Sequence, residues 1–306
     1  MSKIYHGEKG YLLLLSEIYH DGVDIPDRTG VGSRALFDAK LVWNEGEFPF
    51  FTHRPVFQRV AFEELWFMLR GKTQTKELEA IGVNFWKGNT SREFLDSRGL
   101  FDLPEGDMGV AYGYQWRRSG GWRSSDGQRH FTKGTDQLAS LFWGLKNDKY
   151  GRRHLISLWN PSQLDGMALT PCWWACQFVV LPKRDGKDYL HLKLHNRSLD
   201  LPFGAVYAVQ QYRMLQMALC RMFGFELGKL SCDLSHVHIY HNQLEWVDEI
   251  NQRSFKEVHT NTIELRPYVK LESSHDLLNL TFDDWVINYT DYNKTPIEAE
   301  RPQMAV

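Results

Sequence analysis

The chain has few of the features that mark disulfide-stapled, membrane-anchored or nucleic-acid-coating proteins. It has four cysteines in 306 residues and no CxxC pair, which predicts reduced thiols. Its 36 basic and 38 acidic side chains give a net charge of −2, which argues against a surface that follows a nucleic-acid backbone. The apolar run at residues 11–15 is too short to cross a bilayer and has no cleavage site after it. We therefore expect a cytoplasmic protein without a membrane anchor.

Internal repeats, low-complexity tracts and Pro-rich linkers are also missing from the sequence, which favours one domain over residues 1–306. With 42% hydrophobic and 24% charged residues, the composition is that of a globular protein and excludes collagen-like or mainly disordered chains. A chain of this length can bury a large core without disulfide or metal staples.

Hydrophobic periodicity predicts an α+β fold. Apolar residues at helical spacing indicate helices at 11–19, 60–69, 136–145 and 208–223. Alternating or apolar runs indicate strands at 35–43, 154–159, 174–181, 190–194 and 237–240, and the turn at 182–188 joins two of them as an antiparallel hairpin. The segment 119–135 is rich in Gly, Ser and Arg and reads as a loop. In helix 60–69, Glu63 and Glu64 lie in an apolar stretch, so at least one of them should be buried.

Cys172 stands among aromatic residues at the start of a predicted strand. Taken alone, a cysteine in this setting is typical of a small, buried hydrophobic residue. Arg152, Arg153 and Arg197, the last followed by Ser198, lie on either side of it in the sequence. If they converge on one site, these arginines would bind a phosphate and favour the thiolate of a nearby cysteine.

The segment His236–His241 carries histidines at i and i+2, which point to the same face of a strand. Such a pair can bind a metal, but no acidic or cysteine residue stands at short ligand spacing, and we predict no metal site. His238 and Tyr240 on one face would equally well hydrogen-bond a sugar hydroxyl. The segment of Trp and Arg residues at 116–129 resembles a nucleic-acid-binding stretch, but it is short and reads as a solvated loop.

Taken together, the motifs of the chain resemble those of thymidylate synthases over nearly its whole length. They occur in the family's order: Asp27-Arg28-Thr29-Gly30, Glu64-Leu65-Trp66-Phe67, Phe85-Trp86, Asn89 to Asp96, Tyr112 to Arg117, Arg152-Arg153, Trp159-Asn160-Pro161, Met167 to Cys172, Arg197 to Asp200, His238-Ile239-Tyr240 and Met304-Ala305-Val306. The resemblance implies an obligate homodimer with a large mixed sheet and flanking helices. It also implies that 5,10-methylenetetrahydrofolate alkylates C5 of a pyrimidine nucleoside monophosphate.

Position by position, the resemblance also implies roles. Cys172 matches the nucleophile that adds to C6 of the base, and Glu64 matches the acid that relays protons through water. Tyr112 and Asn196 join them as catalytic candidates. The nucleotide contacts are Arg28, Arg197, Ser198, Asp200, Ala208, His238 and Tyr240, with Arg152 and Arg153 reaching across from the partner subunit. The folate contacts are Trp86, Asn89, Asp200, Phe203, Gly204, Tyr207 and the C-terminal Val306.

Three departures from the family pattern bear on the substrate. Trp173 stands where the family has His, Asn196 where it has Gln, and Ala208 where it has the Asn that reads the uracil edge. Because an alanine can neither donate nor accept, the site should lose much of its selection for uracil. The Phe203-Gly204 pair resembles phage deoxycytidylate hydroxymethylases, although these carry Asp where this chain has Ala208. We therefore expect C5 hydroxymethylation of cytidylate or deoxycytidylate, in which water captures the exocyclic methylene intermediate.

Two alternatives stay open. A divergent thymidylate synthase would methylate deoxyuridylate and make dihydrofolate in step, and a catalytically inactive homologue would only bind nucleotide or RNA. The intact Cys172, Glu64 and arginines weigh against the second, since a pure binder needs no thiol. The sequence leaves the choice between ribose and deoxyribose open, as it does a ligand contact for Lys133 in the Gly-rich loop.

Overall fold

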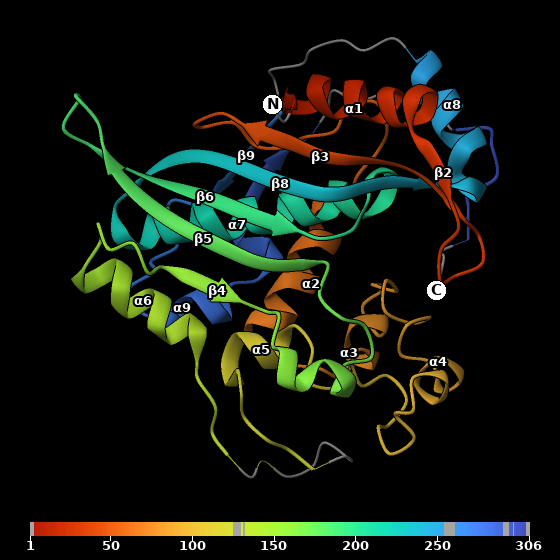
Figure 1. Ribbon diagram of the computed structural model, residues 1–306. Helices are drawn as coiled ribbons and strands as arrows, with labels where there is room; N and C mark the ends of the chain where they lie inside the picture. Colours follow the sequence, from red (N-terminus) through yellow and green to blue (C-terminus); the bar gives the residue numbers. More distant parts are fainter. Residues whose placement is uncertain are drawn as a thin grey trace.

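The chain folds as an α+β protein around one large mixed sheet, as the sequence predicts. The computed structural model describes residues 3–124, 130, 132–253, 261–289, 294–295 and 297–303. Figure 1 shows the long strands crossing the molecule with helices packed against them. The α+β expectation and its large mixed sheet with flanking helices are confirmed.

The main sheet has eight strands, six of them in the order β1-β3-β8-β6-β5-β4, with β2 pairing β3 and β7 pairing β8. Pairs β1–β3, β6–β8 and β7–β8 are parallel and the others are antiparallel. The strands are β1 (Lys3–His6), β2 (Val23–Ile25), β3 (Ser33–Trp43), β4 (Leu155–Ser157), β5 (Trp173–Pro182), β6 (Asp188–Asn196), β7 (Leu199–Asp200) and β8 (Glu226–Tyr240). A separate ribbon pairs β9 (Thr262–Leu265) with β10 (Trp285–Asn288).

The helices cover the sheet and extend the molecule below it (Figure 1). Helix α7 packs on β6 and β8 and contacts α2, while α1 packs on β1, β3 and β8. The α-helices are α1 (Gly7–Asp21), α2 (Gln58–Leu69), α3 (Lys76–Glu79), α4 (Arg92–Ser97), α5 (Gly113–Arg118), α6 (Gln137–Asn147), α7 (Val206–Phe223), α8 (Leu244–Gln252) and α9 (Ser274–Asn279). Short turns are η1 (Pro161–Gly166), the π-helical η2 (Leu201–Ala205), η3 (His241–Gln243) and η4 (Phe282–Asp284).

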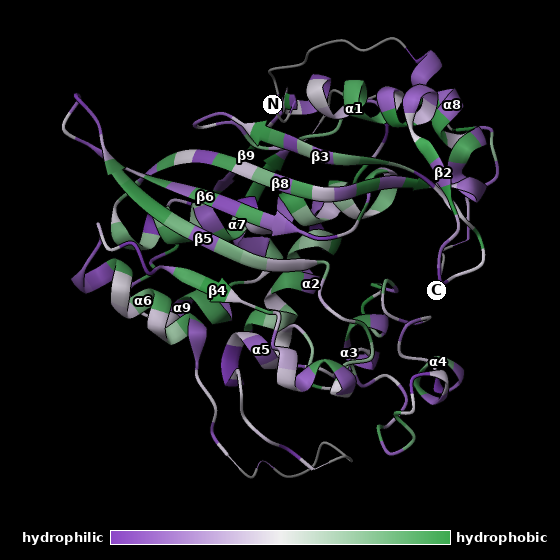
Figure 2. Cartoon of the chain, viewed as in Figure 1, coloured by the Kyte–Doolittle hydropathy of each residue, from purple (hydrophilic) through white to green (hydrophobic). Residues whose placement is uncertain are grey.

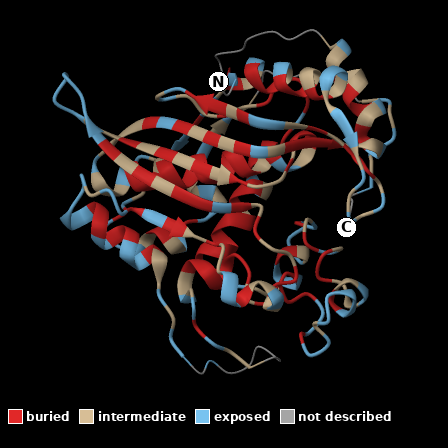
Figure 3. Cartoon of the chain, in the orientation of Figure 1, coloured by how far each residue is buried: buried red, intermediate tan, exposed pale blue. Residues whose placement is uncertain are grey.

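Alternation along the strands decides which face of the sheet is covered. In β6, Leu190, Leu192 and Leu194 are buried, whereas the residues between them are half-buried and polar. Figure 2 shows this mixture of hydropathy along the strands, and Figure 3 shows the matching alternation of burial. Because successive side chains point to opposite faces, the leucines reach the core under α7 and the polar residues face away from it.

The predicted helices at 11–19, 60–69, 136–145 and 208–223 correspond to α1, α2, α6 and α7, and the predicted hairpin is β5–β6. One strand prediction was much too short: the strand placed at 237–240 begins at Glu226. Leu230, Cys232 and Leu234 are buried there and alternate with polar residues, which is a strand pattern that the prediction passed over.

All four cysteines are free thiols. Within the described part of the chain, no helix combines the length and the apolar character needed to cross a membrane.

Candidate active site

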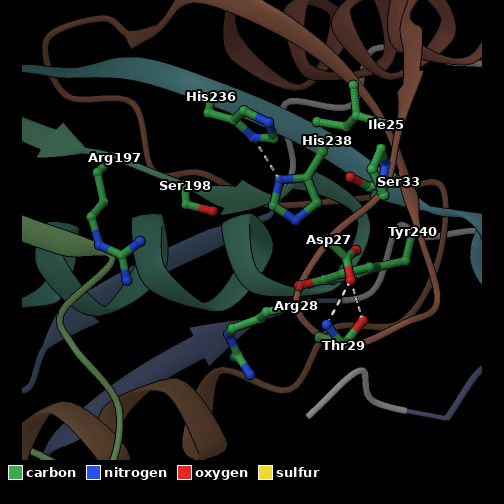
Figure 4. A pocket seen from close by; sticks show the side chains of 11 residues that line it. Ile25, Asp27, Arg28, Thr29, Ser33, Arg197, Ser198, His236, His238 and Tyr240 are labelled. Atoms are coloured by element: carbon green, nitrogen blue, oxygen red, sulfur yellow. Dashed lines mark hydrogen bonds between the residues drawn. The ribbon is translucent and has the colours of Figure 1, made fainter.

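A cavity of about 390 Å³ opens where the loop after β2, the end of β6 and the end of β8 meet (Figure 4). Three segments far apart in the sequence supply its walls, and they bring cationic, hydroxyl and imidazole groups together. It is lined by Ile25, Pro26, Asp27, Arg28, Thr29, Ser33, Arg197, Ser198, His236, His238 and Tyr240. A cavity with two arginines and several hydroxyl groups suits an anionic, hydroxylated ligand.

The loop that carries Arg28 is held by a tight turn. Asp27 Oδ1 accepts hydrogen bonds from the backbone N–H of Thr29 at 2.8 Å and from its hydroxyl at 2.5 Å. Such side-chain bonds to the backbone two residues on stabilise an Asx turn. The turn presents Arg28 to the cavity, where Figure 4 shows its side chain on the side facing Arg197.

His238 and Tyr240 lie on one face of β8, with ring centroids 4.8 Å apart, as the i, i+2 spacing predicts. Nδ1 of His236 lies 3.2 Å from Nδ1 of His238, so one ring donates to the other. Burial, reinforced by His236, lowers the pKa of His238 to about 4, and burial raises the pKa of Tyr240 to about 12. Near pH 7 both side chains are therefore neutral and suited to bonding hydroxyl groups.

Arg197 links the cavity to Cys172. Its Nη2 lies 3.8 Å from Cys172 Sγ, and its backbone N–H donates to the carbonyl oxygen of Cys172 at 3.0 Å. Its Nε donates to the carbonyl of Pro171, which fixes the guanidinium. Burial raises the pKa of the Cys172 thiol, and the charges of Arg197 and Arg28 oppose that rise. The structure thus joins a half-buried thiol to an anion-binding cavity.

A line of contacts runs from Cys172 to Glu64. The Tyr112 hydroxyl accepts a bond from the backbone N–H of Cys172 at 2.9 Å, and its ring lies 5.5 Å from that of Trp86. Trp86 Nε1 donates to Glu64 Oε1 at 2.7 Å. Gln211 Nε2 donates to Glu64 Oε2 at 2.5 Å. A buried carboxyl therefore lies within the same group of residues as the thiol.

Glu64, rather than Glu63, is the buried acid of α2: it is 9% exposed, and Glu63 is only partly buried. Burial raises the pKa of Glu64 to about 7, although the bonds from Trp86 and Gln211 lower it. A carboxyl of this pKa holds or releases a proton near neutral pH, as a general acid or base must.

The π-helical turn η2 places the residues between β7 and α7. Asp200 caps it by accepting from the backbone N–H of Phe203 at 3.4 Å, and Gln243 donates to the other oxygen at 3.2 Å. Burial raises the pKa of Asp200 to about 6. Phe203 and Gly204 follow in the turn, and the Tyr207 ring lies 4.9 Å from that of Phe85. Ala208 is buried on α7.

Several predicted site residues lie away from the cavity within this chain. Arg152 and Arg153 are exposed in the loop before β4, and Lys133 is exposed as well. Asn196 is buried, and neither oxygen nor nitrogen of its amide has a partner among the described residues. Asn89 is also buried, and its Nδ2 meets no acceptor in the part of the chain that the structure describes. Val306 lies outside the described residues.

Sequence reasoning assigned no role to several residues that the fold brings to these sites, among them Asp27, Ser33, His236 and Gln211. Asp27 carried a local signal, since it opens the turn that holds Arg28. For Gln211, the only signal in the sequence was its position three residues after Ala208, on the same face of the helix. Among the described residues, no group of His, Cys, Asp and Glu side chains is arranged to hold a metal ion.

A thiol beside an arginine-lined cavity, with a buried carboxyl of raised pKa nearby, is the set of groups that enzymes of the cysteine-nucleophile class use. The chain belongs to the thymidylate synthase family, since the family model of that name matches residues 9–303. Members of this family are one-carbon transferases that use 5,10-methylenetetrahydrofolate. The resemblance read from the sequence motifs is therefore confirmed.

Curated relatives carry the same name. The chain is 33% identical over 299 residues to the thymidylate synthase of Agaricus bisporus, covering 95% of this chain and 97% of that protein. It is 34% identical over 300 residues to the thymidylate synthase of Saccharomyces cerevisiae, covering 94% of each. It is 37% identical over 243 residues to a probable thymidylate synthase of Schizosaccharomyces pombe, covering 78% of this chain and 39% of that longer protein.

The expectation of cytidylate or deoxycytidylate hydroxymethylation was wrong. Relatives at 33–37% identity over most of the chain are named thymidylate synthase, and they favour methylation of deoxyuridylate. The structure gives a physical reason for one part of the error. Trp173 is buried and packs near Tyr212 in the core, with ring centroids 6.4 Å apart. The core accommodates the indole ring of Trp173, so the replacement of His by Trp at this position does not by itself open a path for water.

Proposed function

We propose that the chain methylates deoxyuridylate to thymidylate, with 5,10-methylenetetrahydrofolate as the second substrate. The observation that carries this proposal is the position of Arg197, which lines the cavity and has Nη2 3.8 Å from Cys172 Sγ. A nucleotide whose phosphate pairs with Arg28 and Arg197 would bring its base toward that sulfur. The names of the relatives support the same substrate.

In this proposal Cys172 is the nucleophile. Its sulfur forms a bond to C6 of the uracil ring as the C5=C6 electron pair moves to C5, which makes C5 reactive toward a one-carbon unit. The thiol proton leaves as the bond forms. After the one-carbon unit has joined C5, C5 loses its proton. As hydride reaches the exocyclic carbon, the C5=C6 bond re-forms, the S–C6 electron pair returns to sulfur, and the thiolate takes up a proton again. The Tyr112 hydroxyl fixes the backbone of the nucleophile by accepting from the N–H of Cys172.

Glu64 is the proton carrier of the proposed reaction. A pKa of about 7 lets its carboxyl hold or give up a proton near neutral pH. Trp86 donates to one oxygen of Glu64 and Gln211 donates to the other, so together they fix the orientation of the carboxyl group. His238 and Tyr240, both neutral, are assigned to the sugar hydroxyls.

The residues assigned to the folate fit a flat aromatic ligand. Trp86, Phe203 and Tyr207 are aromatic, and the Nδ2 of Asn89 is a buried donor that has no partner among the described residues. Asp200 and Gly204 complete the set beside them. The folate supplies the one-carbon unit and the hydride that reduces it to a methyl group.

We further infer that two copies of the chain form the working unit, in which Arg152 and Arg153 of each copy complete the phosphate site of the other. Their exposure in the single chain supports this assignment. One hydrophobic cluster runs from Tyr5 to Trp285, which supports a single domain over residues 1–306. The four free thiols support the cytoplasm as its compartment.

The test incubates the full-length protein with deoxyuridylate and 5,10-methylenetetrahydrofolate, and follows the nucleotide mass and the absorbance of dihydrofolate. The expected product carries one added CH₂, with one dihydrofolate formed per nucleotide. The variant Cys172→Ser should abolish turnover. The variant Cys220→Ala is the matched control, because Cys220 is a buried thiol of α7 outside the cavity.

A product with an added CH₂O and no dihydrofolate would overturn the proposal. So would a chain that binds deoxyuridylate but leaves it unchanged in the presence of folate, with Cys172→Ser binding equally well.

A further inference from the structure

Gln211 connects the two helices that meet behind the sheet. It belongs to α7, is 7% exposed, and donates from Nε2 to Glu64 Oε2 of α2 at 2.5 Å. The other oxygen of Glu64 accepts from Trp86 at 2.7 Å. Because both carboxyl oxygens receive a donor, Glu64 is held in one orientation, and Gln211 is held with it.

The bond to Glu64 occupies one end of the Gln211 amide group and leaves the other end available. In the hydrogen bond that the structure shows, the NH₂ group of Gln211 donates to Glu64 Oε2, so Oε1 is turned away from it. Among the described residues none donates to this Oε1, and it is not one of the fully enclosed polar atoms. The amide therefore keeps a free acceptor that borders open space.

Ala208 lies three residues earlier on α7, and residues at i and i+3 share a helix face. Its methyl group leaves this face without a polar group one turn before Gln211. The side chain of Gln211 is longer than that of the Asn which the family pattern has at position 208. An amide that starts one turn later on the same face can therefore approach the region that Ala208 leaves without a polar group.

We propose that Gln211 reads the pyrimidine edge in this chain, with Oε1 accepting the N3–H of uracil while Nε2 holds Glu64. The inference rests on the proposed function and names the residue that selects its base. Cytosine has a bare lone pair at N3, which would face the lone pairs of Oε1. Discrimination then follows from an unpaired, mutually repelling pair of acceptors in a buried site.

The test measures equilibrium binding of deoxyuridylate and deoxycytidylate by calorimetry, without folate, so that no turnover is needed. Wild type should prefer deoxyuridylate by about tenfold or more, the worth of one good buried hydrogen bond. Gln211→Leu should weaken deoxyuridylate about tenfold and deoxycytidylate much less. In the double variant Gln211→Leu, Ala208→Asn, the restored amide should recover most of the preference.

Gln210→Leu is the matched control. Gln210 is also buried on α7, but its Nε2 donates to the carbonyl of Pro49, away from Glu64. We expect it to change stability and to leave the ratio of the two affinities as in wild type. Gln211→Met provides a second substitution of similar length if Gln211→Leu folds poorly.

Equal loss of both nucleotides in Gln211→Leu, or an unchanged ratio, would overturn the inference even if the wild type makes thymidylate. A wild type without methylation activity, whose preference for deoxyuridylate still depends on Gln211, would instead refute the proposed function and keep the assignment of Gln211. A wild type that binds both nucleotides equally would overturn the inference outright.

Discussion

The hydroxyl of Tyr112 accepts a hydrogen bond of 2.9 Å from the backbone N–H of Cys172, across 60 residues of sequence. Tyr112 is one of two non-glycine residues with positive φ in the described part of the chain, at φ 24° and ψ −87°. A backbone in this region costs about 1–3 kcal/mol and persists where the surrounding structure enforces it. The strain lies directly beside the candidate nucleophile.

Tyr112→Phe should lower kcat/KM for the proposed reaction by about 10- to 100-fold, because the N–H of Cys172 loses its acceptor and the thiol loses its fixed position. Steady-state kinetics with deoxyuridylate and folate measures this. Tyr114→Phe is the control, since the buried hydroxyl of Tyr114 has no partner among the described residues. Comparable losses in both variants would contradict a specific role for the Tyr112 bond.

Glu64 makes stability depend on pH. Its pKa is about 7 in the folded chain and 4.5 ordinarily, so the folded state holds more protons than the unfolded state between these values. Stability therefore falls as pH rises from 4.5 to 7. The loss attributable to Glu64 is about 3 kcal/mol across this window. Denaturant unfolding of wild type and Glu64→Gln from pH 4.5 to 8 should show this fall in wild type and much less of it in the variant.

Glu63→Gln serves as the control for this pH series. Glu63 precedes Glu64 on α2 but is only partly buried. The unfolding free energy of Glu63→Gln should vary with pH in the same way as that of wild type. Identical profiles for wild type and Glu64→Gln would show that Glu64 is ionised in the folded chain at all these pH values.

Arg213 should be among the most sensitive core positions. Its guanidinium is fully buried and donates to the carbonyl oxygens of Glu47, Asn44 and Gly228 and to Gln216 Oε1, all at 2.7–2.8 Å. Lysine cannot reproduce this spread of donors, so Arg213→Lys should cost about 2–4 kcal/mol of unfolding free energy. Urea unfolding measures the cost. Exposed Arg59, whose guanidinium donates to the carbonyl of Ile81 and to no other described residue, gives the control Arg59→Lys with little change.

Gly228 allows β8 to approach β6 closely. A Cβ at this position would lie 2.4 Å from the carbonyl oxygen of Leu190, at the point where the β6–β8 register shifts. Gly228→Ala should therefore destabilise the chain by about 2–3 kcal/mol, seen as a lower Tm. In the control Gly186→Ala, the added Cβ has no atom within 4 Å. This variant is strained only by the positive φ of 79° at residue 186, which costs about 1 kcal/mol. A smaller loss for Gly228→Ala than for Gly186→Ala would refute the close approach.

Local patterns predicted the elements whose apolar residues repeat without interruption. Helices α1, α2, α6 and α7 and the β5–β6 hairpin follow from periodicity in single stretches of sequence. The first half of β8 was missed although Leu230, Cys232 and Leu234 alternate with polar residues, because the buried position before them is a glycine, Gly228. Helix α5 was not predicted, because it begins directly after Tyr112, whose strained backbone conformation is not favoured by any local propensity.

The order of motifs from Asp27 to Tyr240 identifies the family, since this order is a property of the chain and needs no coordinates. It also placed Cys172, Arg197 and His238 among the functional candidates. The substrate inferred from Trp173, Asn196, Ala208 and the Phe203-Gly204 pair was wrong, because the relatives at 33–37% identity are named thymidylate synthase and favour deoxyuridylate.

Which residues share a site depends on the packing of elements that are far apart in the sequence. This packing buried Glu64 and left Glu63 only partly buried, and it brought Gln211 to Glu64 across 147 residues of sequence. It also set the guanidinium of Arg197 beside Cys172, 25 residues away. Such contacts depend on how α2, α7 and the sheet pack against one another. Helical and strand periodicity specify only which face of an element is buried, and leave open which side chain of another element it meets.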